Sequence, residues 1–280
     1  MRVPGFARNP YDRFFVALGH IDAAERAVAD GCDAIFIDTF ADYGMAEIRA
    51  AVPVPVIGAG ESGIVAASAN GTRDFSIVTV WPLSMNYLYK ERLDNSPGGN
   101  RRLRVKHVLP ETELQKAGTD GFIKNRMERH ESAVIDLLAA RVQQVADESG
   151  VGTILLGCTC MAPAGPAIQE CVDVEVIEGT RNGLAVAFAT LAAPRHGAAD
   201  RRRVARARHR SGVTPRRVRA VRLARVGRGD RRLARVASAA SSHTGFASCT
   251  SASASSAVAP NAEQESRPRM SAMKPAFSLL

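Results

Sequence analysis

The chain has 280 residues, a formal net charge of +9 and 46% hydrophobic residues, a length that favours one or two domains. No apolar run approaches the roughly 20 residues of a membrane-spanning helix, and the first residues lack the apolar core of a secretion signal. Two of the five cysteines lie in the run Cys158-Thr159-Cys160. This usage excludes a disulfide framework and favours reduced thiols in the cytoplasm.

The positive charge is confined to the end of the chain. Residues 195–280 hold 19 Lys and Arg against 4 Asp and Glu, and residues 201–235 alone contain 15 arginines, followed by a Ser/Ala run. An arginine arm for nucleic acid, a disordered tail and a frame-shifted read-through of a GC-rich gene all fit this composition. The scarcity of lysine and aromatic residues argues against nucleic acid, so we expect a low-complexity basic tail over residues 195–280 that is disordered or out of frame.

The part before the tail alternates helical and strand-like stretches. The expected helices cover residues 12–29, 42–51, 61–69, 121–149, 163–171 and 181–191, and the expected strands cover 33–37, 54–57, 75–80, 103–108, 153–156 and 174–177. Strands that alternate with helices form parallel sheets covered on both faces. The sequence therefore predicts an α/β fold.

An internal repeat divides this α/β part into two lobes. The run AIFIDTFADYGMAEIRAAVPVPVIGAGESGIVAA resembles TILLGCTCMAPAGPAIQECVDVEVIEGTRNGLAVA, with offsets of 119 at Thr39 and Cys158 and 120 at Gly63 and Gly183. We predict pseudo-symmetric lobes over residues 1–90 and 91–194, with a ligand crevice at the carboxyl ends of the strands. Thr39 and Cys158 are then equivalent points on opposite lobes.

Cys158 is the first catalytic candidate. It follows the strand-like run TILLG and precedes a helix, and a thiol in such a place is poised to act as a base or nucleophile at neutral pH. We expect Cys160, two residues further on, to face elsewhere. The Cys-x-Cys spacing has no second ligand pair or histidine cluster beside it, which argues against zinc or another metal.

Thr39 is the second candidate, at the end of the corresponding strand in the first lobe. A hydroxyl does not ionise near neutrality, so we expect Thr39 to hold a carboxylate or carbonyl oxygen of a substrate. Asp38 and Asp42 flank it, and either is a base if its pKa is raised. We favour a helix-capping role for Asp42.

The run from Gly58 to Gly63 matches the dinucleotide pattern G-x-G-x-x-G by letter. The next strand-like run, FSIVTV, is not followed by the acidic residue that holds a ribose hydroxyl, so we expect no NAD. The amides of Gly60 and Glu61, at the start of a helix, are expected to bind a substrate carboxylate instead, with Ser62 and Thr79 nearby.

These segments resemble the aspartate/glutamate/hydantoin racemase superfamily, in particular its hydantoin-racemase-like branch. The run LGCTCMA at residues 156–162 is close to that family's G-C-T-G-M, and DAIFIDTFADYGM, VPVIGAGESG and FSIVTVW extend the resemblance over residues 12–193. The resemblance implies two flavodoxin-like lobes, no cofactor, and two cysteines on opposite faces of the substrate, of which one removes a proton at the stereocentre and the other returns one. By position, Cys158 is then the acid/base of the second lobe. The family turns that shape the pocket contain Gly60, Glu61, Ser62, Thr79 and Thr159.

The sequence departs from this family in three places. Thr39 stands where the family has its first cysteine, as in the arylmalonate decarboxylase branch, where a single thiol protonates a carbanion after loss of carbon dioxide. The usual first strand, with an Asn-containing loop, precedes the point where this sequence begins, which predicts an incomplete first lobe with unpaired backbone at its edge. The basic tail replaces the family's last helix.

The sequence therefore predicts a cofactor-independent racemase or isomerase of a small carbon acid, that is, an amino acid, an amino-acid derivative or a hydantoin. Cys158 and Thr39 are the expected catalytic residues. The expected substrate contacts are Asp38, Gly60, Glu61, Ser62, Thr79 and Thr159. A single-cysteine decarboxylase of a malonate-type acid and an inactive fragment or tail-borne nucleic-acid binder are the alternatives. We expect a small-molecule partner, a cytoplasmic location and no membrane contact, and a homo-oligomer is compatible with the sequence.

Overall fold

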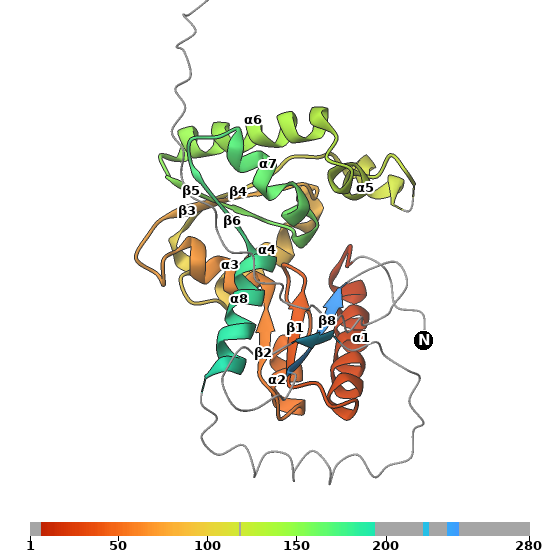
Figure 1. Ribbon diagram of the computed structural model, residues 1–280. Helices are drawn as coiled ribbons and strands as arrows, with labels where there is room; N and C mark the ends of the chain where they lie inside the picture. Colours follow the sequence, from red (N-terminus) through yellow and green to blue (C-terminus); the bar gives the residue numbers. More distant parts are fainter. Residues whose placement is uncertain (1–6, 118, 194–220, 224–233, 241–280) are drawn as a thin grey trace, which may run out of the picture.

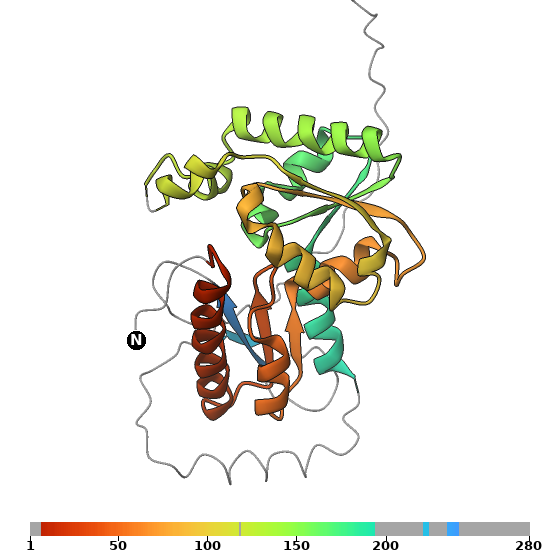
Figure 2. The same ribbon diagram turned by 180° about the vertical axis from the view of Figure 1, so that it is seen from behind.

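The structure, a computed structural model, describes residues 7–117, 119–193, 221–223 and 234–240. These residues form two α/β lobes, which lie one above the other in Figure 1 and are seen from behind in Figure 2. The α-helices are α1 (Pro10–Ala29), α2 (Met45–Ala51), α3 (Ala59–Ala67), α4 (Asn86–Asp94), α5 (Ile123–Glu128), α6 (Ser132–Ser149), α7 (Gly165–Glu170) and α8 (Gly179–Ala192). Short 3-10 helices are η1 (Leu83–Met85), η2 (Gly99–Arg101), η3 (Glu111–Lys116) and η4 (Thr159–Ala164). Within these described ranges, no helix has the length and apolar character needed to span a membrane.

The strands form two four-stranded sheets. They are β1 (Ala34–Asp38), β2 (Val56–Gly58), β3 (Phe75–Thr79), β4 (Arg102–His107), β5 (Thr153–Leu156), β6 (Glu175–Glu178), β7 (Val221–Leu223) and β8 (Ala234–Ala240). The lower sheet has the order β2-β1-β8-β7 and the upper sheet β4-β3-β5-β6. All neighbours are parallel except β7 and β8. The expected α/β fold with parallel sheets is confirmed.

The sheets divide the chain differently from the expected lobes over residues 1–90 and 91–194. Strand β3 pairs with β4 and β5 and so belongs to the upper sheet. Helix α8 comes after the upper sheet in the chain but packs against α3 and β1 of the lower lobe. The chain therefore crosses between the lobes twice, which a boundary drawn along the sequence does not capture.

Part of the basic tail completes the lower sheet. Strand β8 runs parallel to β1, from the pair Ala34 and Val236 to the pair Asp38 and Ala240. Strand β8 lies next to β1 in the lower sheet in the same way as β3 lies next to β5 in the upper sheet. The edge of β1 that we expected to be unpaired is therefore covered by residues 234–240. The rest of residues 195–280 lies outside the described residues.

The predicted repeat is visible in the positions of the elements. Helix α3 begins at Ala59 directly after β2, and α8 begins at Gly179 directly after β6, the offset of 120 that the sequence shows. The two helices pack side by side, and a Cβ added to Gly63 would lie 3.1 Å from the Cα of Gly179. Packing this close requires glycine at the contact and joins the two copies of the repeat.

Two expectations for the helices are wrong. The helix expected over residues 121–149 is broken into α5 and α6, because His130 between them has a left-handed backbone with φ of 52°. Helix α4 was not expected at all. Its exposed face is polar and its buried side carries only a few apolar residues, among them Leu88 and Tyr89, so its sequence lacks a strong helical pattern.

The start of α3 is closed by a carboxylate from the β1–α2 connection. The Oδ1 and Oδ2 atoms of Asp42 accept hydrogen bonds from the backbone N–H groups of Gly60 (3.0 Å) and Glu61 (2.7 Å). Arg92 of α4 lies 3.5 Å from the same carboxylate, and a Cβ on Gly58 would overlap it. Asp42 is thus a helix cap, as expected, but it caps α3 rather than α2.

The burial of Asp42 has a consequence for its protonation. Burial raises its pKa from 3.8 to about 7, although Arg92 and the two amides act in the opposite direction. The folded protein therefore keeps this proton up to a higher pH than the unfolded chain does. Since the folded state binds more protons between these two pKa values, this carboxyl stabilises the fold at low pH and does so less as the pH rises through the window.

We therefore expect a pH-dependent stability difference between the wild type and Asp42→Asn. Between about pH 4 and about pH 7.5, the free energy of unfolding of the wild type should fall relative to that of the variant by more than about 1.4 kcal/mol, the equivalent of one pKa unit. Urea unfolding at several pH values measures this difference. Asp22→Asn, at an exposed position of α1, is the control, and a difference that stays constant with pH would contradict the assignment.

Candidate active site

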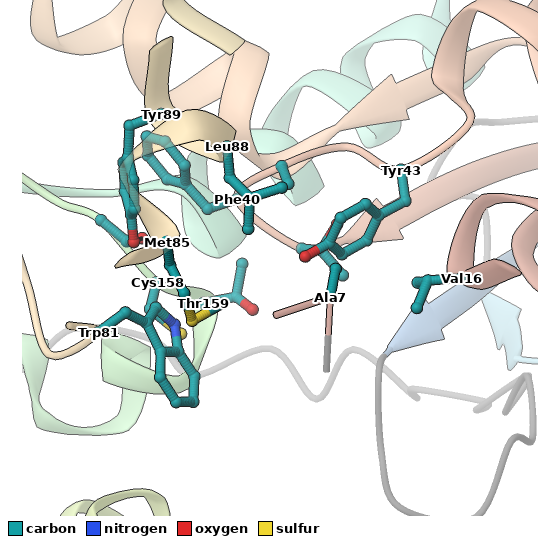
Figure 3. Close-up of a pocket in the computed structure, with 13 residues that line it drawn as sticks. Ala7, Val16, Phe40, Tyr43, Trp81, Met85, Leu88, Tyr89, Cys158 and Thr159 are labelled. Carbon is teal, nitrogen blue, oxygen red and sulfur yellow. Dashed lines mark hydrogen bonds between the residues drawn. The ribbon is translucent and has the colours of Figure 1, made fainter. Parts of the chain in front are cut away.

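A pocket lies between the lobes, at the carboxyl ends of β1, β3 and β5 (Figure 3). Its lining comes from the first lobe, from the connection after β3 with α4, and from the turn after β5. The lining residues are Ala7, Val16, Thr39, Phe40, Ala41, Tyr43, Trp81, Met85, Leu88, Tyr89, Gly157, Cys158 and Thr159. The pocket is where the repeat predicted a crevice, and it brings Thr39 and Cys158 together.

Cys158 stands at the start of η4, two residues after β5 ends. It is half-buried and lines the pocket, and Figure 3 shows it on the same side as Trp81 and Met85, across from Tyr43. The next residue, Thr159, donates a hydrogen bond from its hydroxyl to the backbone carbonyl of Asp38 (3.2 Å). The turn that carries Cys158 is therefore tied to the end of β1 in the opposite lobe.

Thr39 lines the pocket and carries a buried hydroxyl without a hydrogen-bond partner among the described residues. Its side chain is 5% exposed, and no group among the described residues hydrogen bonds to its Oγ1 atom. Leaving a buried hydroxyl without a partner costs about 1–3 kcal/mol. A pocket-lining hydroxyl of this kind is suited to meet a polar atom of a bound molecule.

The state of the cysteines differs from the expectation. Cys158 and Cys160 are joined by a disulfide, so Cys160 does not face elsewhere and the thiols are not reduced in this structure. The cause is the tight 3-10 turn of η4, which brings the two Cα atoms to 5.2 Å, within the range that a disulfide spans. A disulfide sulfur carries no proton, so acid/base work by Cys158 requires the reduced form.

The aspartates and the residues at the start of α3 lie beside the pocket, not in its lining. The carboxylate of Asp38 accepts a hydrogen bond from Thr180 of α8 (3.0 Å). Burial raises the pKa of Asp38, although this hydrogen bond acts to lower it. The amides of Gly60 and Glu61 are already bonded to Asp42, so they are not available to a substrate carboxylate as we expected. Glu61 itself pairs with Arg49, and Ser62 is buried within α3.

Thr79 does not line the pocket but supports the turn that carries Cys158. Its hydroxyl lies 2.5 Å from that of Tyr89, and Tyr89 donates to the backbone carbonyl of Gly157 at 2.7 Å. Because a carbonyl can only accept, the Tyr89 proton points to Gly157, and Thr79 must be the donor to Tyr89. The N–H of Trp81 donates in turn to Thr79. This buried chain fixes the residue immediately before Cys158.

The sequence analysis missed the apolar wall of the pocket. The side chains that form most of it are Val16, Phe40, Tyr43, Trp81, Met85 and Leu88. Trp81, the only tryptophan of the chain, directly follows the strand-like run FSIVTV, and Phe40 and Tyr43 lie in the connection between β1 and α2. Aromatic residues shortly after the strand ends could therefore have indicated this wall from the sequence. The residues of α4 show no such pattern.

Removing the Tyr89 hydroxyl tests the support of the turn. We expect Tyr89→Phe to lower the free energy of unfolding by about 1–3 kcal/mol, because Thr79 and the Gly157 carbonyl lose their buried partner. It should also lower kcat for proton exchange by about tenfold or more with a smaller change in KM, because the sulfur is displaced by a fraction of an ångström. Thermal unfolding and steady-state kinetics measure both effects. Tyr11→Phe, at an exposed position, is the control, and an unchanged kcat in Tyr89→Phe contradicts the positioning role.

Comparisons with known proteins agree with this architecture. The sequence model of Asp/Glu/hydantoin racemases matches residues 1–187. A hydantoin racemase from Pseudomonas sp. (strain NS671) is 29% identical over 181 residues, which make up 65% of this chain and 67% of that relative. A hydantoin racemase from Rhizobium meliloti is 29% identical over 177 residues, covering 62% of this chain and 67% of the relative.

A solved structure shares the fold. The allantoin racemase from Klebsiella pneumoniae superposes with a TM-score of 0.54 at 23% identity, over 67% of this chain and 73% of that chain. The resemblance that the sequence suggested is thereby confirmed for both the family and the fold. Since the family match covers well over half of the residues, the chain belongs to the Asp/Glu/hydantoin racemase family.

Proposed function

We propose that the protein is a cofactor-independent racemase or isomerase in which the reduced Cys158 thiol moves a proton to and from a carbon atom of the substrate. The observation that carries this proposal is the placement of Cys158 and Thr39 in one pocket between the lobes. Family membership supports the same reaction class. The cytoplasmic location and the homo-oligomer expected from the sequence stay predictions, as does the absence of a nucleic-acid partner.

The chemistry follows from the two side chains. In the reduced protein, the Cys158 thiolate takes the proton from a carbon next to a carbonyl group and becomes a thiol. The electron pair left on the carbon is delocalised onto the carbonyl oxygen. The Thr39 hydroxyl, which has no partner among the described residues, donates a hydrogen bond to this oxygen as its negative charge develops. The proton then returns from sulfur or from solvent.

The lining favours an uncharged substrate with an apolar substituent. None of the described residues that line the pocket carries a charge, and aromatic and aliphatic side chains form most of the wall. A carboxylate placed there loses its hydration without gaining an ionic partner. A hydantoin ring, which presents amide groups to Thr39 and an apolar substituent to Trp81 and Tyr43, therefore fits better than a dicarboxylic amino acid. The hydantoin racemases among the relatives support this choice.

A pocket with one thiol and one hydroxyl is asymmetric. Cys158 can remove and return a proton on its own face, but Thr39 cannot act as a base near neutral pH because a hydroxyl does not ionise there. Exchange of the substrate proton with solvent should therefore be faster than inversion of the stereocentre. The same asymmetry suits a decarboxylase, in which a single thiol protonates one face of a carbanion. Release of carbon dioxide from an arylmalonate, with no exchange into hydantoins, would favour that alternative.

Loss of the sulfur should abolish exchange. In the presence of a reducing agent, we expect Cys158→Ser to lower the rate of deuterium incorporation at the stereocentre of 5-benzylhydantoin by about 10²- to 10⁴-fold, the contribution of a positioned acid/base. Proton NMR in deuterated buffer measures the rate. Cys171→Ser, at an exposed free cysteine outside the pocket, should keep the wild-type rate. Undiminished exchange in Cys158→Ser would remove the basis of the proposed mechanism.

The role of Thr39 is tested by two variants with opposite expectations. Thr39→Val removes a buried hydroxyl that lacks a partner, so it should leave the free energy of unfolding unchanged or raise it by up to about 1 kcal/mol, while exchange slows by about tenfold or more. Thr39→Cys adds a thiol opposite Cys158, so inversion should approach the rate of exchange. Chiral chromatography beside the NMR assay measures the ratio of the two rates. Unaltered exchange in Thr39→Val would show that the hydroxyl does not contact the substrate.

A further inference from the structure

We propose that Cys158 is a reversible oxidation site with Cys160 as its resolving thiol, so that a hydroperoxide switches the active site off and a dithiol switches it on again. The disulfide between these residues is the closed state of this pair. The inference rests on the proposed function, because oxidation matters to turnover only if Cys158 works as a thiol.

The geometry makes the pair self-contained. Only Thr159 separates the two cysteines, both lie at the first turn of η4, and their Cα atoms are 5.2 Å apart. Closing the disulfide therefore needs no rearrangement of another element. Both side chains are half-buried and Cys158 lines the pocket, so a small oxidant that enters the pocket reaches its sulfur.

The surroundings single out this pair among the described cysteines. The N–H of Cys160 donates to the Cys158 sulfur at 3.1 Å, a contact that favours the thiolate over the thiol in the reduced protein. Of the cysteines outside this pair that the structure describes, Cys32 is buried in the lower lobe and Cys171 is exposed at the end of α7. Neither lines the pocket.

The oxidation balances in two steps. The Cys158 thiolate attacks a hydroperoxide, so a sulfur–oxygen bond forms, the oxygen–oxygen bond breaks, and the alcohol or water derived from the peroxide leaves. The Cys160 thiol then attacks the sulfenic sulfur, so the disulfide forms and a water molecule leaves. The two thiols have given up two electrons to the peroxide. A dithiol such as dithiothreitol reverses the change by thiol–disulfide exchange and becomes a cyclic disulfide itself.

The closed state changes the chemistry of the site and leaves its framework in place. With the disulfide formed, the turn keeps the hydrogen bond from Thr159 to Asp38 and the one from Tyr89 to Gly157. The contacts that join the catalytic turn to the opposite lobe and to α4 are therefore compatible with oxidation. What Cys158 loses is its ionisable proton, so oxidation blocks proton transfer without unfolding the protein.

The experiment follows activity and the covalent state of the pair in parallel. The full-length reduced protein is treated with hydrogen peroxide, and exchange into 5-benzylhydantoin is measured before and after addition of dithiothreitol. Free thiols are blocked with N-ethylmaleimide, and mass spectrometry of the tryptic peptide 142–181, which contains Cys158, Cys160 and Cys171, locates the disulfide by fragmentation. We expect peroxide to slow exchange by about tenfold or more and to link Cys158 to Cys160, while the circular dichroism spectrum stays unchanged. The dithiol should then restore activity.

Cys160→Gly and Cys160→Ser supply the decisive controls. Both variants keep Cys158 but lack a resolving thiol, so they should be active without any reductant. Peroxide should inactivate them progressively, as Cys158 is oxidised to a sulfinic acid that dithiothreitol does not reduce. A wild type whose 158 and 160 thiols both stay free after peroxide treatment would overturn the proposal. A reduced wild type that forms the linkage but shows no exchange would contradict the proposed function and still support the oxidation site.

Discussion

The architecture depends on the close approach of α3 and α8. A Cβ on Gly179 would overlap the carbonyl of Ala59, and one on Gly183 would overlap the ring of Phe36, so neither position accepts a larger residue without a shift of the backbone. The two strand–turn–helix units of the repeat therefore pack directly against each other across the boundary between the lobes. Each unit places the end of its strand at this boundary, and for that reason Thr39 after β1 and Cys158 after β5 meet in one pocket.

The same boundary decides what kind of molecule the pocket can accept. The first amides of α3 would be a natural site for an anion, but the carboxylate of Asp42 occupies them, and Gly58 and Gly60 leave the room that it needs. With these donors engaged, the described lining offers aromatic and aliphatic surface and a few hydroxyl groups. The capping of α3 by Asp42 thus also keeps a charged group of a substrate away from the first amides of this helix.

The sequence contained the repeat, and the repeat was sufficient to predict the fold class and the pairing of Thr39 with Cys158, because both depend on local pattern and spacing. It did not contain the partner of Asp42, the chain from Thr79 through Tyr89 to Gly157, or the wall formed by α4, since each arises from contacts between segments far apart in the chain. The run from Gly58 to Gly63 matches a dinucleotide pattern by letter, and in the structure its glycines admit a carboxylate of the protein itself. The Cys158–Cys160 linkage was missed because Cys160 was expected to face away from Cys158, whereas the 3-10 turn of η4 brings the two residues together.

The substitution of a hydroxyl for a thiol at position 39 concentrates the proton-transfer capacity of the pocket in one atom. In a site with two thiols, oxidation of one leaves a second acid/base group on the opposite face. Here the first lobe contributes the hydroxyl of Thr39 at the position equivalent to Cys158, and among the described residues that line the pocket only Cys158 carries a sulfur that can act as a thiol. In the proposed mechanism, a neighbouring cysteine that can take this sulfur into a disulfide therefore controls proton transfer, whether the product is an inverted stereocentre or a protonated carbanion.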